Sequence, residues 1–212
     1  MNKLELFVEA IKSIKTVGTV TFSSKYLVEK MTEPIDFSSA KCIVELGAGN
    51  GCITKQLLQK MRPDAKLISF EINSKFIDLL KAEISDKRLV LIHDSAEYIK
   101  KYVQAEGFES ADYVVSSIPL VWLSDDLNER IINNIQTILK PSGLFLQLSY
   151  TITTYKKFNH QFPKIQFKFT PLNLPPAFVF VCKKEINTTT PAVKVKKINL
   201  NKFKNFIDKL TA

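Results

Sequence analysis

Residues 44–51 read VELGAGNG, and this stretch decides the fold because it follows an apolar run and opens a helical pattern. Glycines at such a turn allow a tight bend and let a ligand lie close to the backbone. Loops that bind dinucleotides space their glycines as G-x-G-x-x-G, whereas this loop reads G-x-G-x-G with Glu45 two positions before the first glycine. A carboxylate there would repel a pyrophosphate, so the loop favours a ligand that carries a positive charge.

Apolar runs and amphipathic segments alternate along most of the chain. Strands are predicted at residues 42–46, 66–71, 89–92, 113–116 and 144–149, and helices at residues 51–61, 74–84, 96–104 and 124–139. This alternation is typical of an α/β fold with a mostly parallel sheet and helices on both faces. Two last strands, at residues 165–169 and 178–182, are joined by a Pro-rich turn without a helix, so we expect them to pair antiparallel.

Two further acidic residues stand at the ends of predicted strands. Glu71 ends the second strand, where a carboxylate can accept hydrogen bonds from both hydroxyls of a ribose. Asp94 follows the third strand, where a carboxylate can accept from an adenine amino group while a neighbouring backbone N–H serves a ring nitrogen. Each could be an ordinary strand-end acid, but three acids at successive strand ends, where ligands bind in such sheets, favour a nucleoside site.

The chain has 212 residues and a formal net charge of +9, and the excess lies in its C-terminal part. Residues 156–212 hold 12 lysines and 2 acidic residues, a net charge of +10, while residues 1–155 hold 18 basic and 19 acidic residues, a net charge of −1. This asymmetry points to an anionic partner, a membrane surface or a nucleic acid, although a solubilising tail would look the same.

The composition argues against several classes of protein. The three cysteines are scattered and there are two histidines, so neither a disulfide framework nor a metal site is expected. No apolar run approaches the ~18 residues that span a bilayer, and the N-terminus has no signal-peptide pattern. We therefore expect a cytoplasmic protein without a transmembrane segment.

The glycine loop, Glu71 and Asp94 together resemble the class I methyltransferases, whose cofactor S-adenosylmethionine carries a cationic sulfonium. The resemblance implies their Rossmann-like fold, a mostly parallel seven-stranded sheet with an antiparallel last strand. It also implies a set of cofactor-binding residues on the loops after successive strands: Glu45, Gly47, Gly49, Gly51, Glu71, Ile72, Asp94, Ser95, Ala96 and Ser116.

Four shorter stretches make the chain similar to the bacterial phospholipid N-methyltransferases, which are related to the rRNA adenine dimethyltransferases. They are GTVTFSSKY at residues 18–26, VVSSIPL at residues 114–120, FLQLSY at residues 145–150 and NLPPA at residues 173–177. Two positions depart from that family: Ser117 stands where it usually has glycine, and Phe22 where proline is common. The resemblance covers roughly residues 2–184 and leaves the lysine-rich tail outside.

The narrower resemblance implies methyl transfer to the amine of a membrane lipid, such as phosphatidylethanolamine or an amino-acid lipid. The expected catalytic residues are Tyr150, Ser116 and Pro119. The Tyr150 hydroxyl and the backbone carbonyls of the loop from Ser116 to Pro119 can accept hydrogen bonds from an amine. The residues expected to bind the substrate are Thr19, Ser23, Ser24, Leu120 and Tyr150. Tyr150 could instead be a packed aromatic residue, and Ser23 or Ser24 a plain helix cap.

Three segments are expected. Residues 1–40 would carry amphipathic helices, the first at residues 3–15, as a lid or a membrane-facing surface. Residues 41–184 would form the cofactor-binding domain, and residues 185–212 a lysine-rich extension with a short helix at residues 200–210. The enzyme would then associate peripherally with an anionic membrane.

Three other functions fit parts of this pattern. An RNA adenine N6-methyltransferase would bind phosphates with the basic tail, but such enzymes usually place an aromatic residue directly after the strand-four proline, where this chain has Leu120. A small-molecule N- or O-methyltransferase would need the same cofactor site. A non-catalytic protein of this fold would have no need for the full set of Glu45, Glu71 and Asp94.

Overall fold

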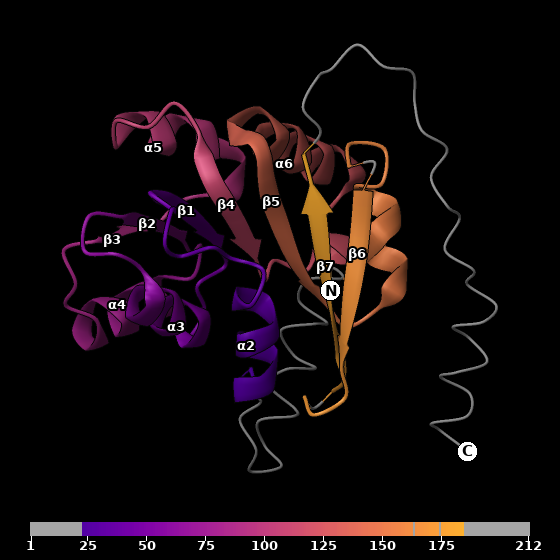
Figure 1. Ribbon diagram of the computed structural model, residues 1–212, viewed down its shortest axis with the longest axis horizontal. Helices are drawn as coiled ribbons and strands as arrows, with labels where there is room; N and C mark the ends of the chain where they lie inside the picture. Colours follow the sequence, from indigo (N-terminus) through magenta and orange to yellow (C-terminus); the bar gives the residue numbers. More distant parts are fainter. Residues whose placement is uncertain (1–22, 163, 174, 185–212) are drawn as a thin grey trace.

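The computed structural model describes residues 23–162, 164–173 and 175–184. Its centre is a seven-stranded sheet with the strand order β3-β2-β1-β4-β5-β7-β6 (Figure 1). The strands are β1 (Cys42–Leu46), β2 (Lys66–Phe70), β3 (Leu89–Ile92), β4 (Ala111–Ser116), β5 (Leu139–Ser149), β6 (Lys164–Thr170) and β7 (Ala177–Lys183). The pairs within β1 to β5 are parallel, and β7 pairs antiparallel with both β5 and β6. The predicted α/β fold with an antiparallel last strand is confirmed.

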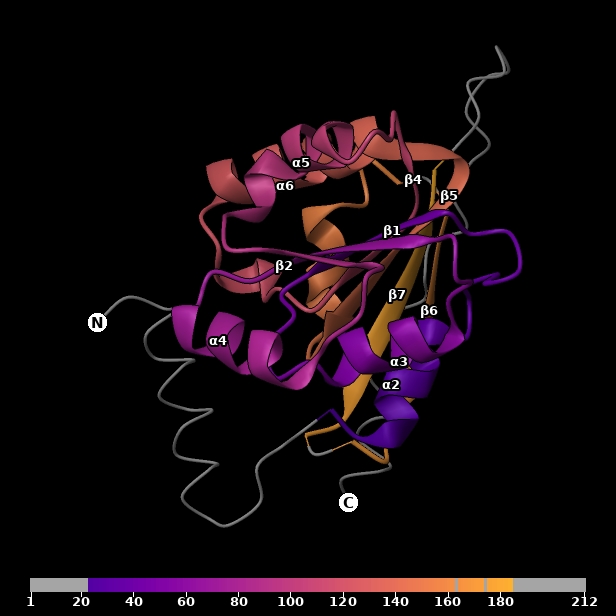
Figure 2. The same ribbon diagram turned by 90° about the vertical axis from the view of Figure 1, so that its left-hand side faces the viewer.

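Helices cover both faces of this sheet. Their bounds are α2 (Lys25–Thr32), α3 (Cys52–Lys60), α4 (Ser74–Glu83), α5 (Ile99–Ala105) and α6 (Asp125–Ile138), with short 3-10 turns η1 (Ala96–Tyr98), η2 (Leu120–Trp122) and η3 (Ile152–Lys157). Helices α2, α3 and α4 lie on one face, and α5, α6 and η3 on the other (Figures 1 and 2). None of the described helices is long and apolar enough to cross a membrane. The helices expected at residues 3–15 and 200–210 lie outside the described residues.

Each face has its own hydrophobic core because a strand alternates its side chains between the two faces. In β1, Val44 and Leu46 join the core beneath α5 and α6, whereas Ile43 joins the core beneath α2 and α3. All five residues of β1 are buried, as expected of a strand in the middle of a parallel sheet. Helix α2 adds Leu27 and Met31 to the second core, so it packs on the same domain as the sheet.

The junction between α6 and β5 differs from the prediction. Helix α6 begins as expected, with the Ser124 hydroxyl capping its first turn. Strand β5, however, starts at Leu139, five residues earlier than predicted, and its register with β4 shifts before Leu144. The run Lys-Pro-Ser-Gly at residues 140–143 therefore forms an irregularity within the strand and not a loop, because the buried Leu139 already pairs with Ala111.

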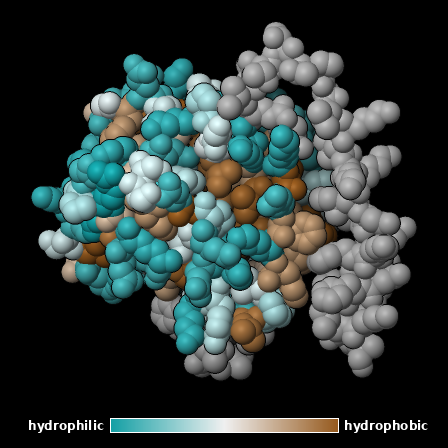
Figure 3. All heavy atoms as spheres, in the orientation of Figure 1, coloured by the Kyte–Doolittle hydropathy of each residue, from teal (hydrophilic) through white to brown (hydrophobic). Residues whose placement is uncertain are grey.

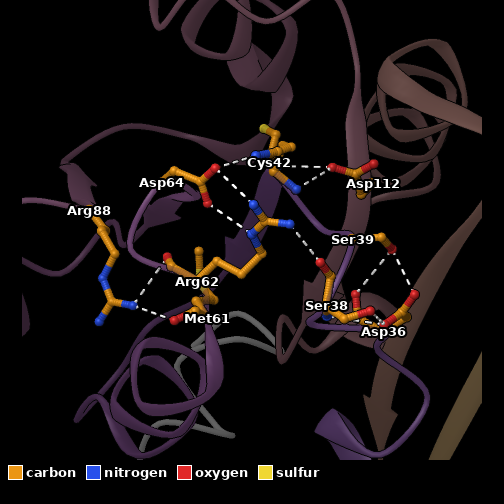
Figure 4. Close-up of polar contacts among 10 residues, drawn as sticks. Asp36, Ser38, Ser39, Cys42, Met61, Arg62, Asp64, Arg88 and Asp112 are labelled. Carbon is orange, nitrogen blue, oxygen red and sulfur yellow. Dashed lines mark hydrogen bonds and ion pairs between the residues drawn. The ribbon is translucent and has the colours of Figure 1, made fainter.

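Polar contacts join the strands at the amino-terminal edge of the sheet, opposite their carboxyl ends (Figure 4). One oxygen of the Asp112 carboxylate accepts from the backbone N–H groups of Lys41 and Cys42, at 2.8 and 2.9 Å, which ties the start of β4 to the start of β1. Its other oxygen accepts from the Lys140 ammonium at 2.6 Å. Since ligands bind at the carboxyl ends of parallel strands, these contacts serve the fold and not the site.

Replacing Asp112 with alanine is therefore expected to lower the free energy of unfolding by about 3 kcal/mol, because two backbone N–H groups and one ammonium lose their acceptor. Urea unfolding measures this loss. Calorimetric titration with S-adenosylmethionine should show an unchanged dissociation constant for the folded variant. A large change in that constant would show that this edge is coupled to the ligand site.

Candidate functional site

The glycine loop after β1 folds back onto the end of β2. The backbone N–H groups of Gly47 and Ala48 both donate to the Phe70 carbonyl, at 2.8 and 3.0 Å. Gly47 and Gly49 have left-handed φ values of 82° and 54°, which L side chains rarely adopt. A Cβ atom added at Gly49 would meet open space. At Gly49 the loop therefore leaves its backbone uncovered, which is what the predicted contact between ligand and backbone requires.

Glu71 fixes this loop from the end of β2. One carboxylate oxygen accepts from the Gly49 N–H and the other from the Asn73 N–H, both at 2.8 Å. Each carboxylate oxygen has two lone pairs, so both can accept a second hydrogen bond from a ribose hydroxyl. Ile72, the next residue, is 66% exposed and offers an apolar surface at the same edge.

Asp94 lies after β3 and is held in one orientation. One carboxylate oxygen accepts from the Ser95 N–H and the other from the Tyr102 hydroxyl, both at 2.7 Å. The Tyr102 hydrogen bond, with help from the Ser95 N–H, holds the pKa of Asp94 below its ordinary value. Ala96, the third residue predicted here, is buried. Tyr102 was missed by the sequence analysis, although its place on α5, eight residues after Asp94, was readable.

Glu45 lies beneath the loop and not on its surface. The carboxyl is 1% exposed, and one oxygen accepts from the hydroxyls of Thr54 and Ser69, at 2.7 and 2.6 Å. In the described part of the chain, the other oxygen has no hydrogen-bond partner. Burial raises the pKa of Glu45 to about 7, and the two hydroxyls oppose that rise. A cationic ligand above the loop would favour the ionised form.

Replacing Glu45 with glutamine is expected to remove a pH dependence of stability. The folded protein releases this proton near pH 7, whereas the unfolded chain releases it near the ordinary value of 4.5. Between these values the folded state holds the extra proton, so the contribution of Glu45 to stability falls as the pH rises from 4.5 through about 7. Urea unfolding at a series of pH values should show wild type losing stability relative to the glutamine variant over that range. A constant difference would contradict this prediction.

The loop after β4 meets the glycine loop through Ser117. Its hydroxyl donates to the Gly47 carbonyl at 2.5 Å, so Ser117 joins the two loops. The Ser116 hydroxyl is buried and has no hydrogen-bond partner among the described residues. The Ile118 carbonyl accepts from the Gln147 side chain and from the Leu120 N–H, both at 2.9 Å. Gln147, a buried residue of β5, thus supports this loop.

Two predicted residues on the β4 loop are used by the fold itself. The Pro119 carbonyl accepts from the Trp122 N–H at 3.0 Å, which closes the turn of η2. Leu120 is buried in the core beneath α6, so the structure gives its side chain no surface for a substrate. Substrate contact by Leu120 stays a prediction that this conformation does not favour.

Asn173 joins two residues that the sequence analysis predicted to bind the substrate. Its side-chain oxygen accepts from the Ser24 N–H at 2.9 Å, and its amide nitrogen donates to the Pro175 carbonyl at 2.7 Å. Tyr150, after β5, hydrogen-bonds to the same side chain and is 43% exposed. Partial burial raises the pKa of Tyr150, and the Asn173 bond opposes that rise. Tyr150 is therefore not a fully packed aromatic residue.

Of the two serines before α2, Ser24 forms the helix cap that was one of their predicted roles. The Ser24 hydroxyl accepts from the Leu27 N–H at 3.2 Å, so Ser24 caps α2. Ser23 is half-buried beside it, and Thr19 lies outside the described residues. Among the described residues, no group of three or more His, Cys, Asp and Glu side chains is placed to hold a metal ion.

Comparisons with known proteins show that this chain is similar to methyltransferases. A family described as a methyltransferase domain matches residues 43–143. The ornithine lipid N-methyltransferase of Singulisphaera acidiphila is 30% identical over 169 residues, which cover 79% of this chain and 88% of that protein. The ribosomal RNA small subunit methyltransferase A of Mycoplasmopsis pulmonis is 28% identical over 183 residues, which cover 82% of this chain and 66% of that protein. A solved SAM-dependent O-methyltransferase from Thermotoga maritima has a TM-score of 0.62 and 16% identity, covering 85% of this chain and 72% of its own.

Proposed function

Because this chain belongs to the class I S-adenosylmethionine-dependent methyltransferases, we propose that it methylates the amine of a lipid headgroup. The observation that carries the choice of substrate is the similarity to an ornithine lipid N-methyltransferase, which extends over 88% of that protein. The ribosomal RNA methyltransferase of Mycoplasmopsis pulmonis is matched over 66% of its length at 28% identity, and two others of that name over 79% and 83% at 22% identity, so the RNA relatives are weaker matches than the lipid enzyme.

The residues at the carboxyl ends of β1, β2 and β3 fit S-adenosylmethionine, which supplies a methyl group activated by its sulfonium sulfur. Glu71 would accept from the ribose hydroxyls with the lone pairs that Gly49 and Asn73 leave open. Asp94 would accept from the adenine amino group, with Tyr102 fixing its carboxylate. Glu45 would favour a positively charged ligand from beneath the loop.

Tyr150 would orient the acceptor amine. An alkylamine resembles lysine, whose pKa is about 10, and only its neutral form can attack a methyl group. Entry into a partly buried site beside a positive charge favours loss of the amine proton to solvent. The raised pKa of Tyr150 keeps its hydroxyl neutral near pH 7, so the hydroxyl would accept a hydrogen bond from the amine and not remove a proton.

Transfer of labelled methyl groups tests the proposal. The full-length chain would be given labelled S-adenosylmethionine with ornithine lipid or phosphatidylethanolamine in detergent micelles, and separately with structured RNA. Label in the lipid fraction that disappears in an Asp94→Ala variant is the expected result. RNA is the second candidate, because the chain has a net charge of +9 and ribosomal RNA methyltransferases are among its relatives. Label in RNA alone, or in neither acceptor, would overturn the lipid proposal.

Replacing Tyr150 with phenylalanine is expected to lower kcat for the lipid about 10- to 100-fold, the cost of one hydrogen bond to a group that gains charge. The dissociation constant for S-adenosylmethionine should not change, because Tyr150 lies after β5 and away from Glu71 and Asp94. A Tyr113→Phe variant, which removes a tyrosine hydroxyl that accepts from the Asp36 N–H away from the site, serves as the control. Equal rates for wild type and the Tyr150 variant would remove Tyr150 from the mechanism.

A further inference from the structure

Exposed hydrophobic side chains gather at one end of the described structure. The large ones are Tyr26, Ile72, Leu79, Tyr98, Tyr150 and Leu172. All but Leu79 follow the carboxyl end of a strand or lie beside such a segment. Tyr26, Tyr150 and Leu172 come from three segments that Asn173 joins, because Asn173 bonds to Ser24 and Tyr150 and is the neighbour of Leu172. We call Tyr26, Tyr150 and Leu172 the docking rim.

The turn between β6 and β7 is the most apolar part of this rim. Leu172 is 64% exposed, and Pro171, Pro175 and Pro176 beside it are also exposed. Figure 3 shows a small hydrophobic patch at the lower end of the molecule, where Figure 1 draws this turn, with hydrophilic side chains beside it. Prolines restrict the backbone, and Asn173 bonds across the turn to the Pro175 carbonyl. These features restrict the backbone of the turn that carries Leu172.

Lys25 places a positive charge beside the rim, which suits an anionic surface. The Lys25 ammonium lies 5.3 Å from the centre of the Tyr26 ring, so a cation and an aromatic ring stand together at the tip of α2. The Lys168 ammonium on β6 lies 3.2 Å from a carboxylate oxygen of Glu33, so its positive charge balances that negative charge. Tyrosines with one apolar and one polar end suit the boundary between headgroups and acyl chains. The +9 charge of the whole chain has the same sign as Lys25.

We propose that the docking rim is the surface by which this enzyme binds an anionic bilayer. Leu172 enters the acyl region while Tyr26 and Tyr150 lie at the depth of the headgroups. This inference rests on the proposed function, since Tyr150 belongs to both the rim and the site. A headgroup at the rim therefore reaches Tyr150 without its acyl chains leaving the bilayer.

Sedimentation with vesicles tests the rim without relying on catalysis. The full-length chain would be mixed with vesicles of phosphatidylglycerol and phosphatidylethanolamine, and with vesicles of phosphatidylcholine. A Leu172→Asn variant is expected to bind the anionic vesicles at least tenfold more weakly than wild type, because burying one leucine in hydrocarbon is worth about that factor or more. Leu79→Asn is the matched control, since Leu79 is 37% exposed on α4. It should bind like wild type.

Several outcomes separate the rim from the proposed function. The proposal of the docking rim would be overturned if Leu172→Asn bound vesicles like wild type. It would also be overturned if Leu79→Asn lost as much vesicle binding as Leu172→Asn. Equal losses of turnover with vesicles and with a short-chain lipid dissolved as monomers would also overturn it, because monomers need no docking. If vesicle binding depended on the rim but no lipid were methylated, the proposal of the docking rim would stand and the proposal of a lipid substrate would be overturned. Weaker binding to RNA and not to vesicles in Leu172→Asn would show that the rim contacts nucleic acid.

Discussion

Replacing Glu71 with alanine is expected to raise the dissociation constant for S-adenosylmethionine at least ~100-fold. Glu71 is proposed to accept from two ribose hydroxyls, and hydrogen bonds to a charged acceptor contribute about 1.5–3 kcal/mol each. The same carboxylate accepts from the Gly49 and Asn73 N–H groups, so its loss also removes one of the contacts that hold the glycine loop at the end of β2. Isothermal titration calorimetry with the purified variant measures the change.

Two further variants make this result specific. Glu71→Gln keeps the shape of the side chain but turns one acceptor into a donor that faces a backbone N–H. Its dissociation constant for S-adenosylmethionine should therefore lie between those of wild type and the alanine variant. Asp112→Ala removes a carboxylate of similar hydrogen bonding at the opposite edge of the sheet and should bind the cofactor normally. If Glu71→Ala bound S-adenosylmethionine as tightly as wild type, the placement of the ribose at β2 would be wrong.

Replacing Gly51 with alanine is expected to lower the free energy of unfolding by about 3 kcal/mol. Gly51 has a φ of +79°, a conformation that costs an alanine about 1–2 kcal/mol. The new Cβ would also lie 2.6 Å from a methyl carbon of Leu80, a fully buried residue of α4 with little room to move. Thermal unfolding should show a melting temperature lower by about 6–12 °C for a chain of this size.

Gly107 provides the control that separates strain from crowding. It has nearly the same φ, +81°, but a Cβ there would meet open space. Gly107→Ala should therefore lower the free energy of unfolding only by the cost of the left-handed backbone conformation, about 1–2 kcal/mol. If both variants lost the same free energy of unfolding, Leu80 would move aside without cost. The crowding at Gly51 would then contribute nothing to the loss of stability.

The sheet could be predicted from the sequence because each strand and helix is specified by local periodicity. Glu71 and Asp94 were found at strand ends for the same reason, since a strand end is visible in a few residues of sequence. The start of β5 was predicted wrongly because Pro141 and Gly143 usually end regular structure, and the pairing of Leu139 with Ala111 is a long-range contact. Local pattern therefore defines the elements, but not where tertiary pairing extends them.

The partners of the site residues could not be predicted in this way. Asn173 and Ser24 are 149 residues apart in the sequence, and the carboxyl of Glu45 is shared by hydroxyls from α3 and β2. Nothing in the local sequence links such positions. The burial of Leu120 was missed for a similar reason, because it depends on core residues from distant parts of the sequence.

Locating the transferred methyl group tests the central claim most directly. The full-length enzyme would be incubated with deuterated-methyl S-adenosylmethionine and a mixture of amine lipid and structured RNA, and both products analysed by tandem mass spectrometry. The account predicts the heavy methyl group on the headgroup nitrogen of the lipid, and none there with Asp94→Ala. A heavy methyl group on adenine, with the lipid nitrogen unlabelled, would contradict it.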